Sequence, residues 1–548
     1  MPVSSNYPDI DIPNVGLWDF LFERKDRPFP DDKSSLKDSS VEFGKGLKAI
    51  FNWRKKEVLA IFSPNSIDTP AITWGTLWAG GIISPANPAY TVNELAFQLK
   101  NSGSKAIVTH ASVLSIAVQA AKKVGIPEDH IILLGDQRDP KARYRHFTSI
   151  RNISRSSRYQ KQKVKPDSDL AFLVYSSGTT GVPKGVMLSH KNIIANVLQF
   201  ASAEGRHLTW NGGFEGKGDC VLAFLPFYHI YGLTCLVTTA FYQGWHLVVM
   251  AKFEIEKWCA HVQNYHVTFS YIVPPVALQL SKHPVVDKYD LSSLRMMNCG
   301  AAPLTQELVE AVYSRIKVGI KQAYGLSETS PTTHSQQWED WRDYIGSVGQ
   351  LLSNQEAKFM TSPEDESAPE EVEVGDVGEL YVRGPNVFLG YHQNPTATRD
   401  CLSEDGWFRT GDVGYLDPKG NFFITDRVKE LIKYKGFQVP PAELEGILVD
   451  NDAIDDVAVI GIESEAHGSE VPLACVVRSA ASKSSGISEK EEAANIVKWI
   501  DSKVAHHKRM RGGVYFVPEI PKTPSGKILR RILKQKLKEG SKAFKAKL

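Results

Sequence analysis

The chain has 548 residues, 42% of them hydrophobic and 23% charged, with a formal net charge of +2. This length exceeds what one compact core usually holds, so we expect two or more domains. The near-neutral charge gives no sign of nucleic-acid binding, since nucleic-acid-binding proteins usually carry a basic excess. Six separated cysteines without a C-x-x-C pair, and an N-terminus that lacks the features of a secretory signal, indicate an intracellular protein with reduced thiols.

Apolar runs alternate with helical patterns in the first part of the chain. We predict strands at residues 58–62, 82–83, 105–109 and 131–134, and helices over residues 73–81 and 111–124. This alternation is typical of βα units and mostly parallel sheets. The predicted fold class is therefore α/β, with a large N-terminal domain of βα-type sheets and a small α+β C-terminal domain.

A loop rich in glycine and hydroxyl groups follows a predicted buried strand at residues 170–175, and a helix is predicted around residues 193–198. Glycines let backbone N–H groups approach an anion, while hydroxyls and a lysine add donors and positive charge. The sequence is not a Walker A motif, because Lys184 is followed by Gly185. A flexible linker is the alternative to a phosphate-binding loop. The candidate phosphate ligands are Ser176, Ser177, Gly178, Thr179, Thr180, Gly181 and Lys184.

Residues 221–242 are largely apolar, but Pro226, His229 and Gly232 interrupt them. We therefore predict a buried segment of a soluble protein and no transmembrane segment. The acidic residues 363–373 are predicted to form an exposed hairpin loop.

A domain boundary is predicted near Lys429, dividing the chain into residues 1–428 and 429–548. After it we predict a helix opening at Pro440 and Pro441, strands at residues 457–462 and 473–477, and a helix over residues 489–504. The last three residues, Ala546, Lys547 and Leu548, are close to the Ser-Lys-Leu peroxisomal address. They predict a peroxisomal import receptor as partner and the peroxisomal matrix as location. The alternative is that the tripeptide is a chance match, in which case we expect the protein in the cytoplasm.

Five further motifs complete the pattern. They lie at residues 300–304 (GAAPL), 322–329 (QAYGLSET), 407–412 (WFRTGD), 426–438 (DRVKELIKYKGFQ) and 521–527 (PKTPSGK). Together with the loop, and in this order, they closely resemble the acyl-adenylate-forming superfamily of acyl-CoA synthetases, adenylation domains and luciferase. The chain is most similar to the 4-coumarate–CoA ligase type, and the resemblance spans nearly its whole length.

The resemblance implies that ATP, Mg²⁺ and coenzyme A act on a small carboxylic acid, which is joined to AMP with release of pyrophosphate and then transferred to CoA. Glu328 would hold Mg²⁺, Thr329 would contact the α-phosphate, Tyr324 would stack on adenine, and Asp412 would accept both ribose hydroxyls. The other implied nucleotide-binding residues, besides the loop, are Gly300, Ala301, Ala302, Gln322, Gly325 and Arg427. Taken singly, each of these side chains could have a purely structural role.

The same resemblance implies a division of labour between two half-reactions. Lys527 would bridge carboxylate and phosphate oxygens during adenylation. The C-terminal domain would then rotate about the hinge residue Lys429, so the domain is expected to be mobile. The rotation would bring Lys433 and Gln438 to the adenylate as part of a CoA-facing segment. The CoA-binding residues implied are Lys435, Gly436, Phe437 and Gln438, with Lys433 as a second catalytic lysine.

The acyl pocket is predicted to be a flat slot for an aromatic ring, left open by glycines 300 and 325. His229 would position or deprotonate the acid's carboxylate. The predicted wall is His229, Tyr231, Cys235, Thr238, Tyr271, Asn298, Gly300 and Gly325.

The chain departs from the family pattern in two places. Asn298 and Cys299 replace a lysine and a serine usual in plant hydroxycinnamate ligases, which puts 4-coumarate itself in doubt. Residues 30–33 also run almost directly into a helix near Ser34, where relatives carry a strand pair, and this shortening could weaken folding.

The leading prediction is an AMP-forming acid–CoA ligase for an aryl or arylalkyl acid. The alternatives are a stand-alone adenylation enzyme that loads a carrier protein, a medium-chain fatty acyl-CoA ligase, a luciferase-like oxygenase, and a non-catalytic scaffold of the same fold. The sequence leaves open the acid, the oligomeric state and the pathway.

Overall fold

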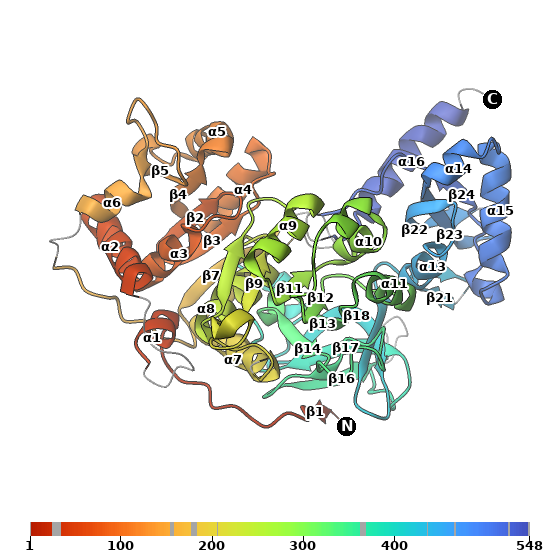
Figure 1. Ribbon diagram of the computed structural model, residues 1–548, viewed down its shortest axis with the longest axis horizontal. Helices are drawn as coiled ribbons and strands as arrows, with labels where there is room; N and C mark the ends of the chain where they lie inside the picture. The colour runs from red at the N-terminus through yellow and green to blue at the C-terminus, as the bar shows by residue number, and fades with distance from the viewer. Residues whose placement is uncertain are drawn as a thin grey trace.

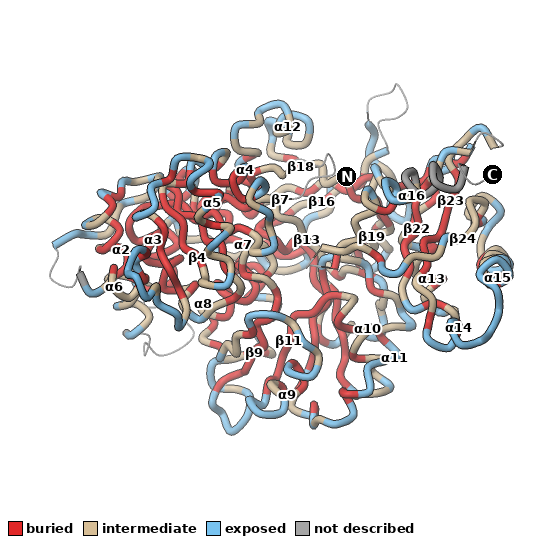
Figure 2. Tube along the Cα trace, turned by 90° about the horizontal axis from the view of Figure 1, so that it is seen from above, coloured by how far each residue is buried: buried red, intermediate tan, exposed pale blue. Residues whose placement is uncertain are grey.

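The computed structural model describes residues 2–24, 34–153, 158–176, 183–204, 206–361, 369–435, 437–464, 467–523 and 526–545. The chain folds into a large N-terminal part and a small C-terminal part that lies at one end of it (Figure 1). Buried residues run through the sheets of both parts, while exposed residues lie mainly on outer helices and loops (Figure 2). The predicted fold class is confirmed: both parts mix helices and strands.

The first sheet has seven strands, and all neighbouring pairs are parallel except the last, β7–β8. In order across the sheet they are β6 (Arg145–His146), β5 (Ile131–Leu134), β4 (Ser104–His110), β2 (Val58–Phe62), β3 (Ile82–Ala86), β7 (Leu170–Ser176) and β8 (Lys184–Ser189). Alternate residues of β2 enter different cores, Leu59 and Ile61 one and Ala60 and Phe62 the other. Helices therefore cover both faces, as parallel sheets require.

The second sheet also has seven strands, parallel up to β13 and antiparallel beyond it. In order they are β10 (His246–Val249), β9 (Cys220–Ala223), β11 (Phe269–Ile272), β12 (Met296–Cys299), β13 (Ile320–Gly325), β14 (Thr332–Ser335) and β15 (Gln350–Leu351). Helix α7 (His190–Glu204) contacts β7 and β8 of the first sheet and β14 of the second, so it joins the two. The predicted helix around residues 193–198 is confirmed by α7.

A third, five-stranded sheet is wholly antiparallel, and the sequence pattern did not predict it. In order its strands are β1 (Val3–Ser4), β16 (Glu356–Met360), β17 (Gly378–Arg383), β18 (Phe408–Leu416) and β19 (Phe422–Arg427). The acidic loop predicted at residues 363–373 falls between β16 and β17, and its first six residues lie outside the described part of the chain.

The C-terminal part contains a hairpin and a three-stranded sheet. The strands are β20 (Ile432–Tyr434), β21 (Phe437–Val439), β22 (Ile454–Ser464), β23 (Ser469–Arg478) and β24 (Val514–Phe516). Its helices are α13 (Pro441–Leu448), α14 (Ala480–Ser484), α15 (Glu489–Asp501) and α16 (Arg530–Lys545). The predicted helix at Pro441 and both predicted strands are confirmed, although β22 and β23 are longer than predicted. The predicted helix over residues 489–504 ends three residues earlier, at Asp501.

The remaining helices cover the sheets of the large part. They are α1 (Leu17–Phe22), α2 (Ser34–Phe51), α3 (Thr69–Trp78), α4 (Val92–Ser102), α5 (Leu114–Val124), α6 (Phe147–Ile153), α8 (Ala240–Gln243), α9 (Ile255–Tyr265), α10 (Pro274–Lys282), α11 (Gln306–Ile316) and α12 (Pro395–Arg399). Helix α3 begins before residue 73 and ends before residue 81, so it is shifted toward the N-terminus of the predicted range. Pro70 lies in its first turn, and Gly80, with a positive φ, follows its end. The apolar residues 221–242 form β9, a buried π-helix (Tyr231–Thr239) and α8. Among the described residues, no helix is long and apolar enough to cross a membrane.

Candidate active site

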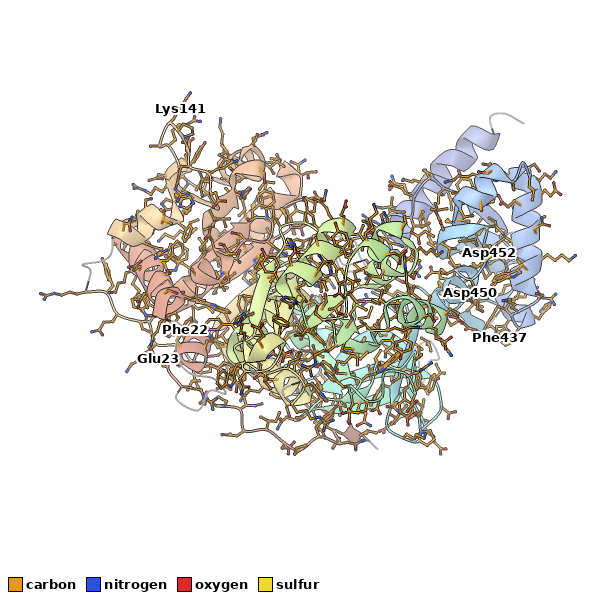
Figure 3. All side chains as sticks on the ribbon, in the orientation of Figure 1. Phe22, Glu23, Lys141, Phe437, Asp450 and Asp452 are labelled. Carbon is orange, nitrogen blue, oxygen red and sulfur yellow. The ribbon has the colours of Figure 1, made fainter. Side chains whose placement is uncertain are left out.

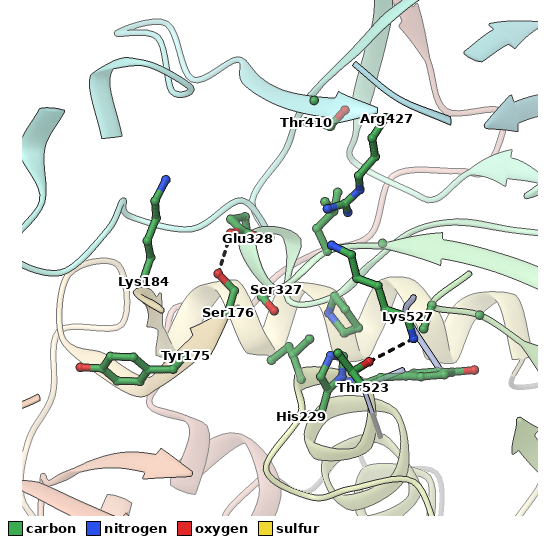
Figure 4. Close-up of a pocket in the computed structure, with 18 of the residues that line it drawn as sticks. Tyr175, Ser176, Lys184, His229, Ser327, Glu328, Thr410, Arg427, Thr523 and Lys527 are labelled. Atoms are coloured by element: carbon green, nitrogen blue, oxygen red, sulfur yellow. Dashed lines mark hydrogen bonds between the residues drawn. The ribbon is translucent and has the colours of Figure 1, made fainter. Parts of the chain in front are cut away.

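A cavity of about 740 Å³ lies where the three sheets of the large part meet the C-terminal part (Figure 4). The large part contributes the ends of β7, β8, β13 and β18, while Lys522, Thr523, Lys527 and Leu529 come from the C-terminal part. Predicted site residues that line it are Ser176, Lys184, His229, Tyr231, Gly300, Ala301, Tyr324, Gly325, Glu328, Arg427, Lys429 and Lys527. Residues more than 350 positions apart therefore face one space.

Asp412 is buried next to the cavity and is bound by two residues that line it, Arg427 and Tyr324. Antiparallel pairing of β18 with β19 sets Asp412 directly opposite Arg427, and the Arg427 Nε lies 2.8 Å from Asp412 Oδ1. The Tyr324 hydroxyl, at the end of β13, donates to Asp412 Oδ2 at 2.5 Å. The Asp412 carboxylate raises the pKa of Arg427 further, and burial together with Asp412 raises the pKa of Tyr324 well above its ordinary value. The Asp412 carboxylate is thus paired and oriented, as recognition of paired hydroxyls requires.

Glu328 also lines the cavity, between Lys184 and Arg427 in the view of Figure 4. Its Oε1 accepts hydrogen bonds from the Tyr391 hydroxyl at 2.8 Å and from Ser176 Oγ at 3.4 Å. The Lys184 ammonium lies 4.7 Å from the centre of the Tyr391 ring. Burial and the Glu328 charge raise the pKa of Tyr391, which therefore stays a donor. The sequence motifs did not point to Tyr391, since its position depends on an isolated bridge to Val186 across 205 residues.

Lys527 enters the cavity from the C-terminal part. Its backbone N–H donates to Thr523 Oγ1 at 3.0 Å, and its side chain runs toward Arg427 (Figure 4). Next to it, Gly526 packs so closely against α10 that an added Cβ would lie 3.0 Å from Pro275 Cδ. Burial and the Arg427 charge lower the pKa of Lys527. An anionic ligand between these two cations would relieve their repulsion.

His229 and Tyr231 form the far wall of the cavity. The Tyr231 backbone N–H donates to His229 Nδ1 at 3.3 Å, and burial lowers the pKa of His229 to about 4. The imidazole is therefore neutral at physiological pH and is a weak base. The Tyr231 hydroxyl donates to the backbone oxygen of Asn298 at 3.2 Å, which fixes the ring across the end of the cavity.

Four residues predicted to form the pocket wall do not line the cavity. The structure corrects that prediction for Cys235, Thr238, Tyr271 and Asn298, which are fully buried behind Tyr231. The Tyr231 and Tyr271 rings meet edge to face, with centres 5.8 Å apart. Tyr231, which lines the cavity, therefore lies between the cavity and Tyr271.

The two glycines assigned to the slot have different roles. A Cβ added at Gly300 would meet the Tyr231 ring at 3.4 Å, an ordinary contact, so the missing side chain leaves space at the wall. A Cβ at Gly325 would lie 2.0 Å from the carbonyl oxygen of Pro331. Gly325 is therefore required by the close approach of two backbones, whatever the width of the slot.

Four further predicted residues lie close to the site but do not line the cavity: Ala302, Gln322, Thr329 and Asp412. The Thr329 hydroxyl accepts from the Leu326 N–H at 2.9 Å and donates to the Pro331 carbonyl. It is thus engaged with its own loop. The Gln322 N–H donates to the side chain of Gln336, and its own side chain is buried.

The predicted CoA-binding residues face away from the cavity. Lys433 and Lys435 are exposed, and Phe437 is 55% exposed and stacked on His507 with ring centres 4.7 Å apart. Figure 3 shows Phe437 at the outer edge of the C-terminal part. Predictions that lie outside the described residues or side chains concern Ser177, Gly178, Thr179, Thr180, Gly181, Gly436, Gln438, Ala546, Lys547 and Leu548.

Two family models match the chain: the AMP-binding enzyme model over residues 34–392, and the AMP-binding enzyme C-terminal domain model over residues 443–527. The chain belongs to the AMP-binding enzyme family. The two matches lie on either side of the boundary predicted near Lys429.

This AMP-binding enzyme has relatives of nearly equal length. It is 37% identical to probable 4-coumarate–CoA ligase 1 of Dictyostelium discoideum, with 97% of each chain covered. It is 36% identical to 4-coumarate–CoA ligase of Pinus taeda, again with 97% of each chain covered. Among solved structures, ATP-bound MatB from Rhodopseudomonas palustris matches with a TM-score of 0.82 at 27% identity, over 96% of this chain and 99% of that one. An anthranilate CoA ligase in complex with anthranoyl-AMP shares the fold, with a TM-score of 0.83 at 23% identity over 97% and 99%.

Proposed function

We propose that this enzyme, an AMP-forming acid–CoA ligase like its relatives, activates an aryl or arylalkyl acid as its acyl-AMP and then transfers the acyl group to CoA. The observation that carries the proposal is the shared cavity, in which Arg427, Glu328 and Lys527 face His229 and Tyr231. Asp412 is bound to Arg427 at the cavity's edge. Such a space accepts a nucleotide between the charged groups and an acyl group at the aromatic wall.

In the first half-reaction a carboxylate oxygen of the acid bonds to the α-phosphorus of ATP. The bond to the bridging oxygen breaks, and pyrophosphate leaves with the electron pair. Asp412 accepts the ribose hydroxyls, Tyr324 lies against the adenine, and Arg427 keeps Asp412 in place. Lys527 neutralises charge between the carboxylate and the phosphate, where a positioned donor in a water-poor site contributes most. His229, neutral because of its low pKa, orients the already ionised acid rather than deprotonating it.

Mg²⁺ belongs to this proposal as well. No group of three or more acidic, histidine or cysteine side chains suited to a metal occurs among the described residues. Glu328 alone, beside Ser176 and Lys184, fits an ion that takes one carboxylate together with phosphate oxygens and water. Bound there, Mg²⁺ would act as a Lewis acid on the phosphate oxygens.

The class of acid follows from the wall at Tyr231. The fixed Tyr231 ring and the space at Gly300 favour a flat ring over a flexible chain. The names of the relatives support this proposal, since they are described as 4-coumarate–CoA ligases. Asn298, buried behind Tyr231, does not supply the charge of the lysine found in plant hydroxycinnamate ligases, so we propose an aryl acid other than 4-coumarate itself.

The second half-reaction requires a different arrangement of the two parts. The CoA sulfur must attack the acyl carbon, with AMP as the leaving group, yet Lys527 and Thr523 occupy this side of the cavity. We propose that the C-terminal part rotates about Lys429, withdraws Lys527 and brings Lys433, Lys435 and Phe437 inward. The outward position of these three residues is what a first-step arrangement requires.

A panel of acids tests the proposal. Acid-dependent exchange of radiolabelled pyrophosphate into ATP reports the first step, and thioester formation with CoA reports both. Benzoate, cinnamate and phenylacetate are expected to exceed hexanoate and octanoate in both assays. Preference for the aliphatic acids would reject the aryl class. Exchange without thioester formation would favour a carrier-loading enzyme, and no exchange with any acid would favour a scaffold.

For localisation we propose the peroxisomal matrix, through an import receptor that reads residues 546–548. A fluorescent protein fused to the N-terminus is expected to enter peroxisomes, and removal of residues 546–548 is expected to leave it in the cytoplasm. Equal distribution of the two fusions would reject the proposal.

A further inference from the structure

Asp426 forms a hydrogen bond that crosses the predicted domain boundary. It stands near the end of β19 in the large part, and the residue is only 6% exposed. Its Oδ2 accepts from the backbone N–H of Ala442 at 3.0 Å, and its Oδ1 accepts from the N–H of Arg427 at 2.7 Å. Ala442 lies in α13, on the other side of Lys429. A single carboxylate therefore ties the third sheet to the first helix of the C-terminal part.

Helix α13 depends on an acceptor from outside itself. Its first residue, Pro441, has no N–H, and its N-cap, Pro440, has no side-chain acceptor. The first amide available at this helix end is that of Ala442, and Asp426 is its acceptor. Carboxylates are favoured at helix N-termini because the exposed amides and the helix dipole carry partial positive charge.

Helix α13 is coupled in turn to the loop that carries Lys527. Glu445 of α13 accepts two hydrogen bonds from Arg530 Nη2, at 2.7 and 2.8 Å, and one from the N–H of Val459 at 2.7 Å. Arg530 is the first residue of α16, three positions after Lys527, and it also pairs with Glu430 next to the hinge. A displacement of α13 is therefore passed to the segment that holds Lys527.

Gly446 and Asp450 mark two further points where the α13 region meets the large part. Gly446 packs on the large part, where an added Cβ would lie 3.2 Å from Thr305 Cγ2. Asp450, just beyond α13, faces the like charge of Glu307 in α11, and burial together with Glu307 raises the pKa of Asp450. A docked arrangement that contains such repulsion needs a specific attraction to compensate for it.

We propose that Asp426 is a positioning residue for the first half-reaction, because it holds the N-terminus of α13 and thereby keeps Lys527 in the cavity. Asp426 contacts neither the nucleotide nor the acid in this role. The bond must break before CoA can react, since its two ends belong to parts that rotate relative to one another. This inference rests on the proposed acid–CoA ligase function.

The two half-reactions, measured separately, distinguish positioning from general support. Burial raises the pKa of Asp426 to about 7, so the exchange assay is run at pH 8, where this carboxyl is mostly ionised. In Asp426→Ala, acid-dependent pyrophosphate exchange is expected to fall about tenfold to a hundredfold, the range for loss of a hydrogen bond to a charged group. Thioester formation from CoA and supplied acyl-AMP of the best acid in the panel should be unchanged or faster. Asp426→Asn keeps one acceptor for Ala442 and should restore part of the exchange.

Asp169→Ala serves as the matched control. Asp169 is a buried carboxylate of the large part that accepts from the Lys165 N–H at 2.6 Å and pairs with Lys55 at 2.6 Å. Any loss in this variant should be shared equally by both half-reactions, since these contacts remain within the large part.

A cross-link reports docking without any activity. Thr305→Cys with Gly446→Cys places two thiols across the interface, and oxidation should join them more slowly when Asp426→Ala is added. Equal loss of both half-reactions in Asp426→Ala, no recovery in Asp426→Asn, or an unchanged cross-linking rate would overturn the inference. A wild-type enzyme without exchange for any acid would instead reject the proposed function, and the cross-linking comparison would still decide the role of Asp426.

Discussion

The hydroxyl of Tyr324 and the carboxylate of Asp412 lie 2.5 Å apart, although 88 residues separate them in the chain. The second carboxylate oxygen is bound by Arg427 at 2.8 Å. A residue expected to stack on adenine therefore also orients the residue expected to hold the ribose. We therefore propose that this one tyrosine contributes to two parts of nucleotide recognition.

Replacing these two residues should give different losses. Tyr324→Phe keeps the ring and removes one donor to Asp412, so the KM for ATP should rise about threefold to tenfold. Asp412→Ala removes the acceptor for both ribose hydroxyls and leaves Arg427 unpaired, so the KM for ATP should rise by about a hundredfold or more. Exchange kinetics at varied ATP measure both values. A larger effect of Tyr324→Phe than of Asp412→Ala would contradict the assignment.

Removal of the Lys527 ammonium should affect the first half-reaction. Lys527→Ala is expected to lower pyrophosphate exchange by about 10²–10³-fold, the usual loss for one donor in a water-poor site. Thioester formation from supplied acyl-AMP should be retained. Lys534→Ala is the control. Lys534 is an exposed lysine of α16, seven residues after Lys527, and its replacement should change neither rate. Equal loss of both half-reactions in Lys527→Ala would argue against the assignment.

Lys433 should behave in the opposite way. It is exposed and outside the cavity in the present arrangement, where its backbone N–H donates to Glu470. Lys433→Ala should therefore leave pyrophosphate exchange within a factor of about two, since surface substitutions usually have small effects. Thioester formation from acyl-AMP and CoA should slow by tenfold or more, on the order of a lost charged contact. A drop in exchange alone would show that the two lysines have been assigned to the wrong steps.

Local patterns predicted the framework of this site but not its contacts. The strand at residues 170–175 and the helix at Pro441 follow from apolar periodicity and proline, which act over a few residues. The bond from Tyr391 to Glu328 and that from Asp426 to Ala442 depend on how distant elements pack. The same reason explains the pocket wall. The sequence placed Asn298 next to the GAAPL motif and so in the predicted wall. Only the packing of the π-helix shows that Tyr231 lies between Asn298 and the cavity.

The buried histidines predict how stability varies with pH. The Leu17 N–H donates to His190 Nδ1, and burial lowers the pKa of His190 to about 4. Between pH 4 and pH 6.5, the ordinary pKa of histidine, His190 is protonated in the unfolded chain but neutral in the folded chain. The free energy of unfolding therefore falls as the pH drops through this range. His190 should account for about 2 kcal/mol of loss between pH 7 and pH 5.

Thermal unfolding of wild type and His190→Gln measures this contribution as a difference. The variant should unfold at a lower temperature at pH 7, and its deficit should shrink by a few degrees at pH 5, because only the wild type loses the His190 contribution. A deficit that stays constant or grows toward pH 5 would show that His190 is not held neutral.

The most direct test of a two-arrangement acid–CoA ligase is to lock the arrangement seen here. A Cβ at Gly446 would lie 3.2 Å from Thr305 Cγ2, a separation that a disulfide can span, so Thr305→Cys with Gly446→Cys should form a cross-link on oxidation. Thr305→Cys alone, oxidised in parallel, controls for loss of the helix cap that Thr305 provides. We expect the cross-linked enzyme to keep acid-dependent pyrophosphate exchange, to lose thioester formation, and to regain it with reductant. If the fully cross-linked enzyme forms the thioester as fast as the same enzyme after treatment with reductant, the account is contradicted.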